Sequence, residues 1–137
     1  MDIFKGLNLS KDIFQKMEKK DANFPDQPKE NDEGNKEYKW KLLDENYKDR
    51  DGKINKLASQ MQYRLYEGDG KAVYLIGVQD NGFSIGVGTD ELYQTLSIID
   101  EASKIINCKI KNVRIYEKDG KYISTIRIIE YGKKENK

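Results

Sequence analysis

Hydrophobic positions fall into two regions of different density, which divide near residue 36. Beyond it, apolar side chains recur with the periods of strands and helices up to about residue 131. From 21 to 36, only Ala22 and Phe24 are apolar, and both prolines of the chain lie here. This stretch buries too little surface to offset its ordering entropy, which predicts a linker. We therefore expect an extended or disordered arm and linker over 1–36, an α+β domain over 37–131 and a basic tail over 132–137.

The periods within the domain predict seven elements. Alternation of apolar and polar residues favours a strand, whereas a spacing of three and four residues favours a helix. Strands are expected over 37–43, 72–78, 83–87, 108–117 and 122–131, and helices over 53–66 and 89–106. The order is thus β-α-β-β-α-β-β. So few helices would cover one face of a mostly antiparallel sheet, which gives a two-layer α+β sandwich with its other face open to solvent or to a partner.

The arm contains a short repeat with two interpretations. Asp2-Ile3-Phe4 recurs ten residues later as Asp12-Ile13-Phe14. The match can be a chance repeat in a disordered tail. Alternatively, the arm orders on a partner protein through apolar anchors, for which the candidates are Ile3, Phe4, Ile13 and Phe14.

Composition limits the chemistry that this chain can perform. A length of 137 residues suits one domain, and the chain has no histidine and one cysteine. Catalytic triads with an imidazole, histidine zinc sites and an internal disulfide are thereby excluded, and a reducing compartment such as the cytoplasm is favoured. The longest apolar run is too short to cross a membrane, and the N-terminus lacks the features of a signal peptide. No nucleophile and base can be paired, so we expect a protein that is not an enzyme and needs no cofactor or metal.

The charge is unevenly distributed. The chain has 25 Lys and Arg against 24 Asp and Glu, a net charge of +1, but residues 101–137 alone contain 10 basic and 5 acidic residues. A basic hairpin with interleaved tyrosines could follow a phosphate backbone and stack on bases. It could equally be an ordinary solvated face whose lysines prevent strands from aggregating. The rRNA-binding candidates are Lys104, Lys109, Lys111, Arg114, Lys118, Lys121, Arg127, Lys133, Lys134 and, on the first helix, Arg64; the stacking candidates are Tyr116, Tyr122 and Tyr131.

Three stretches of the domain resemble a known family. They are EYKWKL over 37–42, LASQMQYRLYEGDG over 57–70 and AVYLIGVQDNG over 72–82, followed by Gly86. Together they are similar to the accessory domain that precedes the GTPase domain in eukaryotic GTP-binding proteins related to translation elongation factors. Lys71 departs from the family pattern, which has Glu there. The chain also contains no P-loop motif, so GTP binding is not carried over.

The resemblance implies the ribosome, its rRNA and its proteins, or tRNA, as the class of partner. A small stand-alone form of this domain is also similar to the microsporidian dormancy factor, a ribosome-silencing protein. That likeness implies a protein that occupies a tRNA site of idle ribosomes, the exit site, and competes there with tRNA. Two alternatives remain: an RNA- or tRNA-binding accessory module of a translational GTPase, and a protein-interaction adaptor that acts through the arm.

Overall fold

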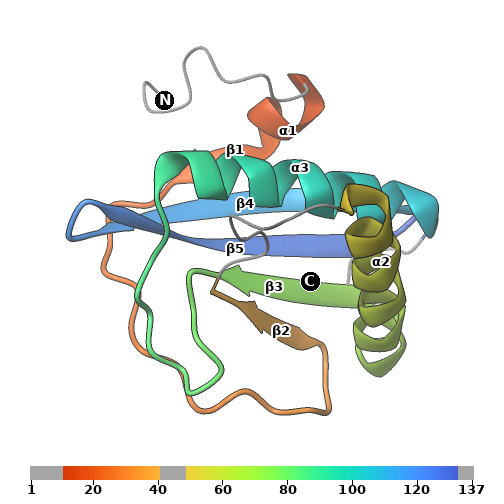
Figure 1. The fold of residues 1–137 in the computed structure, drawn as a ribbon, viewed down its shortest axis with the longest axis horizontal. Coiled ribbons are helices and arrows are strands. Elements are labelled where there is room, and N and C mark those ends of the chain that lie inside the picture. The colour runs from red at the N-terminus through yellow and green to blue at the C-terminus, as the bar shows by residue number, and fades with distance from the viewer. Residues whose placement is uncertain (1–10, 41–48, 133–137) are drawn as a thin grey trace.

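Five strands form one mixed sheet in the order β1-β4-β5-β3-β2 (Figure 1). The structure is a computed structural model, and it describes residues 11–40 and 49–132. Within these ranges the elements are α1 (Lys11–Lys16), β1 (Met17–Lys19), β2 (Lys36–Lys39), α2 (Arg50–Glu67), β3 (Lys71–Ile76), α3 (Thr89–Ile105), β4 (Cys108–Lys118) and β5 (Lys121–Glu130).

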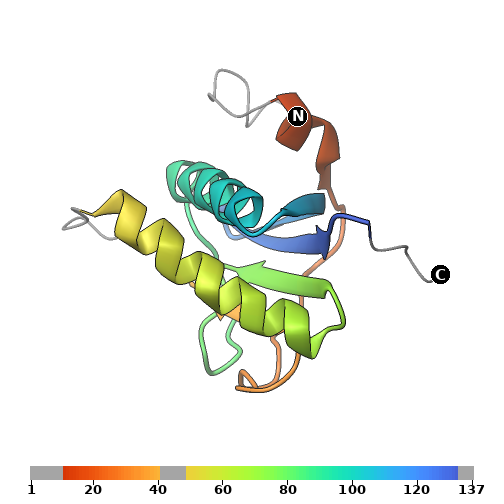
Figure 2. The ribbon, with the colours of Figure 1, turned by 90° about the vertical axis from the view of Figure 1, so that its right-hand side faces the viewer.

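The α+β class and the two-layer sandwich predicted from the sequence are confirmed. Figure 2 shows α2 and α3 together on one side of the sheet. Their apolar stripes pack on the sheet residues of the same side, so that Met61, Leu92 and Ile126 are fully buried. The layer forms because each stripe repeats at helical spacing while the strands present every second residue to it.

The sheet is antiparallel at its centre and parallel at both edges. β5 pairs antiparallel with β4 and with β3, whereas β2 pairs parallel with β3 and β1 pairs parallel with β4. Parallel neighbours need a crossover connection, and α2 lies in the connection between β2 and β3. The alternating pattern along each strand does not reveal this direction, which is why the sequence alone predicts a mostly antiparallel sheet.

The prediction of a strand over 83–87 is wrong. This segment forms only isolated bridges, from Val78 to Ser84 and from Val87 to Tyr122. Its backbone is interrupted because Gly82 and Gly86 have φ angles of 97° and 88°, outside the range of a strand. A tight turn forms at Asp80-Asn81-Gly82, where the Gly82 N–H donates to the Gln79 carbonyl at 2.8 Å.

The segment expected to be an extended arm contains regular structure over 11–19. β1 adds an edge strand to β4, and the neighbouring helix α1 places Ile13 in a buried position with 2% of its surface exposed. Phe14 and Met17 pack against the main core. The repeat around Ile3 and Phe4 lies outside the described residues.

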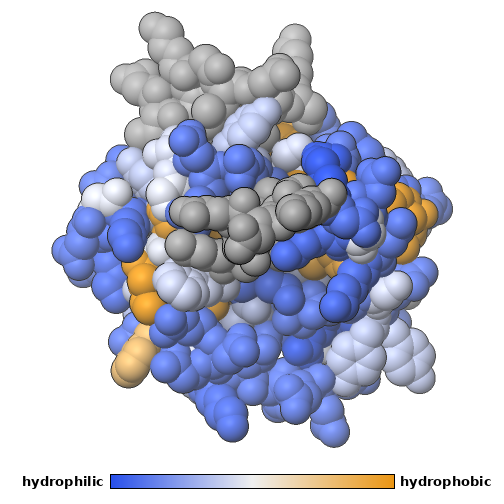
Figure 3. All heavy atoms as spheres, viewed as in Figure 1, coloured by the Kyte–Doolittle hydropathy of each residue, from blue (hydrophilic) through white to orange (hydrophobic). Residues whose placement is uncertain are grey.

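The surface on the helix side is mainly polar. Figure 3 shows hydrophilic side chains over most of this face, with apolar areas in smaller patches. In the described part of the chain, no helix is both long enough and apolar enough to span a bilayer.

In place of a strand over 83–87, the backbone of Gly77 lies close to Gly86 and Tyr122. A substitution at Gly77 tests this close approach. Gly77 has a φ of 86°, and a Cβ there would lie 3.0 Å from both the Gly86 Cα and the Tyr122 carbonyl oxygen. Gly120 has a similar φ of 80°, but a Cβ there would have nothing within 4 Å. We expect Gly77→Ala to lose about 1–3 kcal/mol more unfolding free energy than Gly120→Ala, because only the former adds a steric clash to backbone strain. Urea denaturation measures both, and equal losses would contradict the close approach.

Candidate nucleic-acid interface

The sheet face opposite α2 and α3 is divided by the linker into a covered end and an open end. The linker runs from β1 at one edge of the sheet to β2 at the other (Figure 1). The Phe24 ring lies 5.0 Å from that of Tyr116, and the Tyr38 hydroxyl donates to the Pro28 carbonyl at 3.0 Å. These contacts bury a second apolar cluster that includes Leu75 and Ile123. The covered end is the one where β4 turns into β5.

The open end holds five basic residues, which we call the basic sheet face. Strand register brings them together from four strands. Arg127 on β5 lies opposite Val73 on β3, and Lys36 on β2 lies opposite the same Val73. The five residues are Lys36, Lys71, Lys109, Arg114 and Arg127.

The remaining members follow from the same ladders. Ile129 on β5 is paired with Lys109 on one side and with Lys71 on the other. Arg114 lies opposite Thr125, which is the next residue after Arg127 on this face of β5. Neighbouring strands are about 4.8 Å apart, so these cations form a compact, fixed array rather than a mobile tail.

The charges of this array are largely uncompensated. Among the described residues, Lys36, Lys71, Arg114 and Arg127 form no side-chain ion pair or hydrogen bond. Glu18 lies opposite Arg114 in the ladder, but its carboxylate is 3.0 Å from the Lys20 ammonium. Clustered cations without partners create the positive potential that attracts phosphate.

Tyr131 is the one aromatic candidate that stays available beside the basic sheet face. Its side chain is 55% exposed, and the Lys109 ammonium lies 5.7 Å from its ring centroid. Tyr122 is buried, and Tyr116 is covered by Phe24. The structure therefore leaves these two tyrosines without the open ring face that stacking on a base requires.

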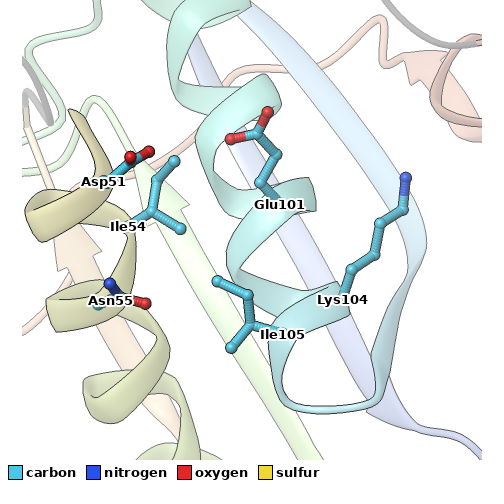
Figure 4. Close-up of a pocket in the computed structure, with 6 residues that line it drawn as sticks. All are labelled: Asp51, Ile54, Asn55, Glu101, Lys104 and Ile105. Atoms are coloured by element: carbon cyan, nitrogen blue, oxygen red, sulfur yellow. The ribbon is translucent and has the colours of Figure 1, made fainter.

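Lys104 lies away from the basic sheet face. It lies on α3 and is paired with Asp100 at 2.9 Å, an interaction that raises the pKa of the lysine. It also borders a groove between α2 and α3 that Asp51 and Glu101 line, and Figure 4 shows its ammonium extending away from α2. With carboxylates on the rim, this groove does not extend the basic surface.

The other lysine candidates are scattered. Lys118 and Lys121 flank the β4–β5 turn at the opposite end of the sheet, where the Lys118 ammonium donates to the Ser84 carbonyl at 2.8 Å. Lys111 lies at an irregularity in the β4–β5 ladder. Lys133 and Lys134 lie outside the described residues.

Arg64, expected to contact rRNA, is buried in the protein and serves its packing. Its Nε donates to Glu37 at 2.9 Å and its Nη1 to the Gly34 carbonyl at 2.9 Å, and only 3% of the residue is exposed. The Glu30 carboxylate lies 3.9 Å away, and burial raises the pKa of this carboxyl. The guanidinium is thus unavailable to a phosphate, and the count of charges along the chain could not reveal its burial.

The sequence interpretation missed Lys36 and Lys71. A signal for Lys71 was present, because Lys71, Val73 and Leu75 share one face of a strand whose other face is buried. Lys36 begins β2, whereas the composition of its neighbours assigns it to the linker. Both lie outside the basic C-terminal third, so a charge count by segment could not find them, although that third does contain Lys109, Arg114 and Arg127.

Fold and surface together define a small α+β domain with a basic sheet face. The chain is 36% identical over 97 residues to GTP-binding protein 2 of mouse and of human, which covers 71% of this chain. It spans only 15% of the length of these relatives. This similarity supports a relationship to a segment of GTP-binding proteins. No family model and no solved structure matches the chain.

The burial of Arg64 predicts a large cost for its removal. Arg64→Ala is expected to lower the unfolding free energy by about 3 kcal/mol, because it removes the buried guanidinium between Glu37 and Glu30 and leaves Glu37 with the Lys39 ammonium alone, at 3.5 Å. Lys104→Ala, which removes an exposed pair four residues apart on a helix, serves as the control and should cost less than about 1 kcal/mol. Chemical denaturation of both variants makes the comparison. A small effect of Arg64→Ala would show that the guanidinium is not essential to the packing.

Proposed function

We propose that this chain is a cytoplasmic, non-enzymatic factor that binds the ribosome through its basic sheet face. In this proposal it contacts rRNA, occupies the exit site for tRNA and silences idle ribosomes. The observation that carries the proposal is the array of five cations on the open end of the sheet, four of them without a partner among the described residues. The choice of the exit site rests on the resemblance of the sequence to the microsporidian dormancy factor and is part of the proposal.

The physics of RNA supports this choice of partner. An rRNA surface is a dense lattice of phosphates, and binding to it releases condensed counterions. Base edges are hidden in the deep groove of an RNA helix, so a protein that contacts such a helix does so by shape and phosphate position. Cations fixed on paired strands suit that kind of contact, because little side-chain and backbone order has to be gained on binding.

An accessory module of a translational GTPase is the second candidate. It is favoured by the 36% identity to GTP-binding protein 2 and by the small share, 15%, of that protein which the match covers. The name of the relative states that it binds GTP. GTP binding through a P-loop is not carried over to this chain, because its sequence has no P-loop motif.

An adaptor that acts through the arm has less support. Ile13 is buried against the domain and Phe14 packs on the main core, so neither is presented to a partner protein. The corresponding residues Ile3 and Phe4 lie outside the described part of the chain.

Co-sedimentation with ribosomes at increasing salt tests the proposal. We expect the protein to travel with ribosomes at low salt and to dissociate as salt rises. Lys71→Glu combined with Lys109→Glu should weaken binding and flatten the dependence of log affinity on log salt by about 1.4, since each phosphate contact contributes about 0.7. Lys56→Glu combined with Lys104→Glu changes the net charge equally at exposed positions of α2 and α3, on the other side of the sheet, and should have little effect.

The outcomes separate the candidates. Failure to sediment with ribosomes at low salt would reject the ribosome-bound factor. Equally strong binding to free tRNA or single-stranded RNA would favour the accessory module instead. If both double variants weaken binding equally, net charge rather than the basic sheet face is responsible. Displacement of the bound protein by deacylated tRNA would support the assignment to the exit site.

A further inference from the structure

A hollow at the end of the sheet brings an exposed indole beside two polar side chains. β2 and β3 are parallel, so the residues that follow them lie at the same end of the sheet. These residues are Trp40 after β2 and the turn from Gln79 to Asn81 after β3. These residues line a hollow of about 430 Å³. This size is within the range of small-molecule sites. The Trp40 side chain is 39% exposed, so part of a large aromatic surface remains accessible to a ligand.

The turn fixes which hydrogen-bonding groups are offered there. The Asn81 Oδ1 accepts the Phe83 N–H at 3.0 Å, which leaves the amide nitrogen of Asn81 as a donor. The Asp80 carbonyl accepts the Glu30 N–H at 2.8 Å. Among the described residues, the Asp80 carboxylate has no hydrogen-bond donor. The hollow thus combines an aromatic plane, a charged acceptor and a neutral donor.

We propose that this hollow binds a guanine base of RNA. The base would stack on the Trp40 indole, and the Asp80 carboxylate would accept hydrogen bonds from its N1–H and its 2-amino group. The Asn81 amide would donate to O6. Guanine is selected because only its Watson–Crick edge offers two adjacent donors to a carboxylate beside an acceptor for the amide; adenine, cytosine and uracil each offer at most one such donor position.

The position of the hollow agrees with the basic sheet face. Lys71 begins β3 and the hollow follows its end, a separation of about 20 Å along the strand. Phosphates held at one end and a base held at the other would fix the direction of a single-stranded or looped-out RNA segment. The choice of RNA as the source of the base rests on the proposed function, whereas the recognition of guanine rests on the residues of the hollow.

The chain has one tryptophan, so its fluorescence reports on this hollow alone. We expect GMP to quench Trp40 emission of the full chain with higher affinity than AMP, CMP or UMP. Asp80→Asn should weaken GMP binding about tenfold, as expected for loss of a charged bidentate contact, and leave AMP within about twofold. Asp119→Asn, at an exposed turn that does not line the hollow, is the matched control and should bind GMP as the parent does.

Three results would overturn the inference: no quenching by any nucleotide at millimolar concentration, equal affinity for all four, or unchanged GMP binding by Asp80→Asn. The Lys71→Glu and Lys109→Glu double variant distinguishes this inference from the proposed function. It should keep its GMP-dependent quenching while its ribosome binding weakens. In the parent protein, ribosome binding without any response to GMP would reject the hollow alone, and a GMP response without ribosome binding would reject the proposed function alone.

Discussion

The Arg64 guanidinium ties α2 to two adjoining segments, the linker and β2, whose contacting residues lie 30 and 27 positions earlier in the sequence. Its donors reach Glu37 on β2 and the Gly34 carbonyl in the linker, and Glu30 lies close by. Burial of a charged group is costly unless its partners are well placed, so this geometry allows little variation in how α2, β2 and the linker meet. Tyr63 and Glu67 add further bonds from α2 to Asp32 and Gly34 of the same linker.

The position of the linker then determines which part of the sheet face stays open. The Glu30 carboxylate also accepts a hydrogen bond from the Tyr38 N–H, a backbone donor on the outer edge of β2. Upstream, Phe24 and Pro28 cover Tyr116 and Tyr38. What remains uncovered is the end where β3 begins and β5 finishes, and this is where the cations lie. A linker held elsewhere would have hidden them.

Local sequence patterns predicted the helices and strands better than they predicted which charged residues form the surface. The stripes of α2 and α3 and the long alternating strands β4 and β5 were evident because burial on one face imposes a regular period. The prediction of a strand over 83–87 failed because Gly82 and Gly86 adopt positive φ angles, which a strand does not have. An apolar, strand-like composition does not reveal such angles. Charge carries no such period: Arg64 and Arg127 look equivalent in the sequence, yet α2 packing buries one and an open strand position exposes the other.

The basic sheet face differs physically from a basic tail of equal charge. Its members come from β2, β3, β4 and β5, so their relative positions depend on the sheet pairing and not on the local sequence. A flexible tail would attract phosphates but would lose conformational entropy on binding, whereas cations on paired strands are already ordered. If this face is the RNA contact, affinity depends on the integrity of the fold as well as on charge. A buried contact such as that of Arg64 then contributes to RNA binding without touching RNA.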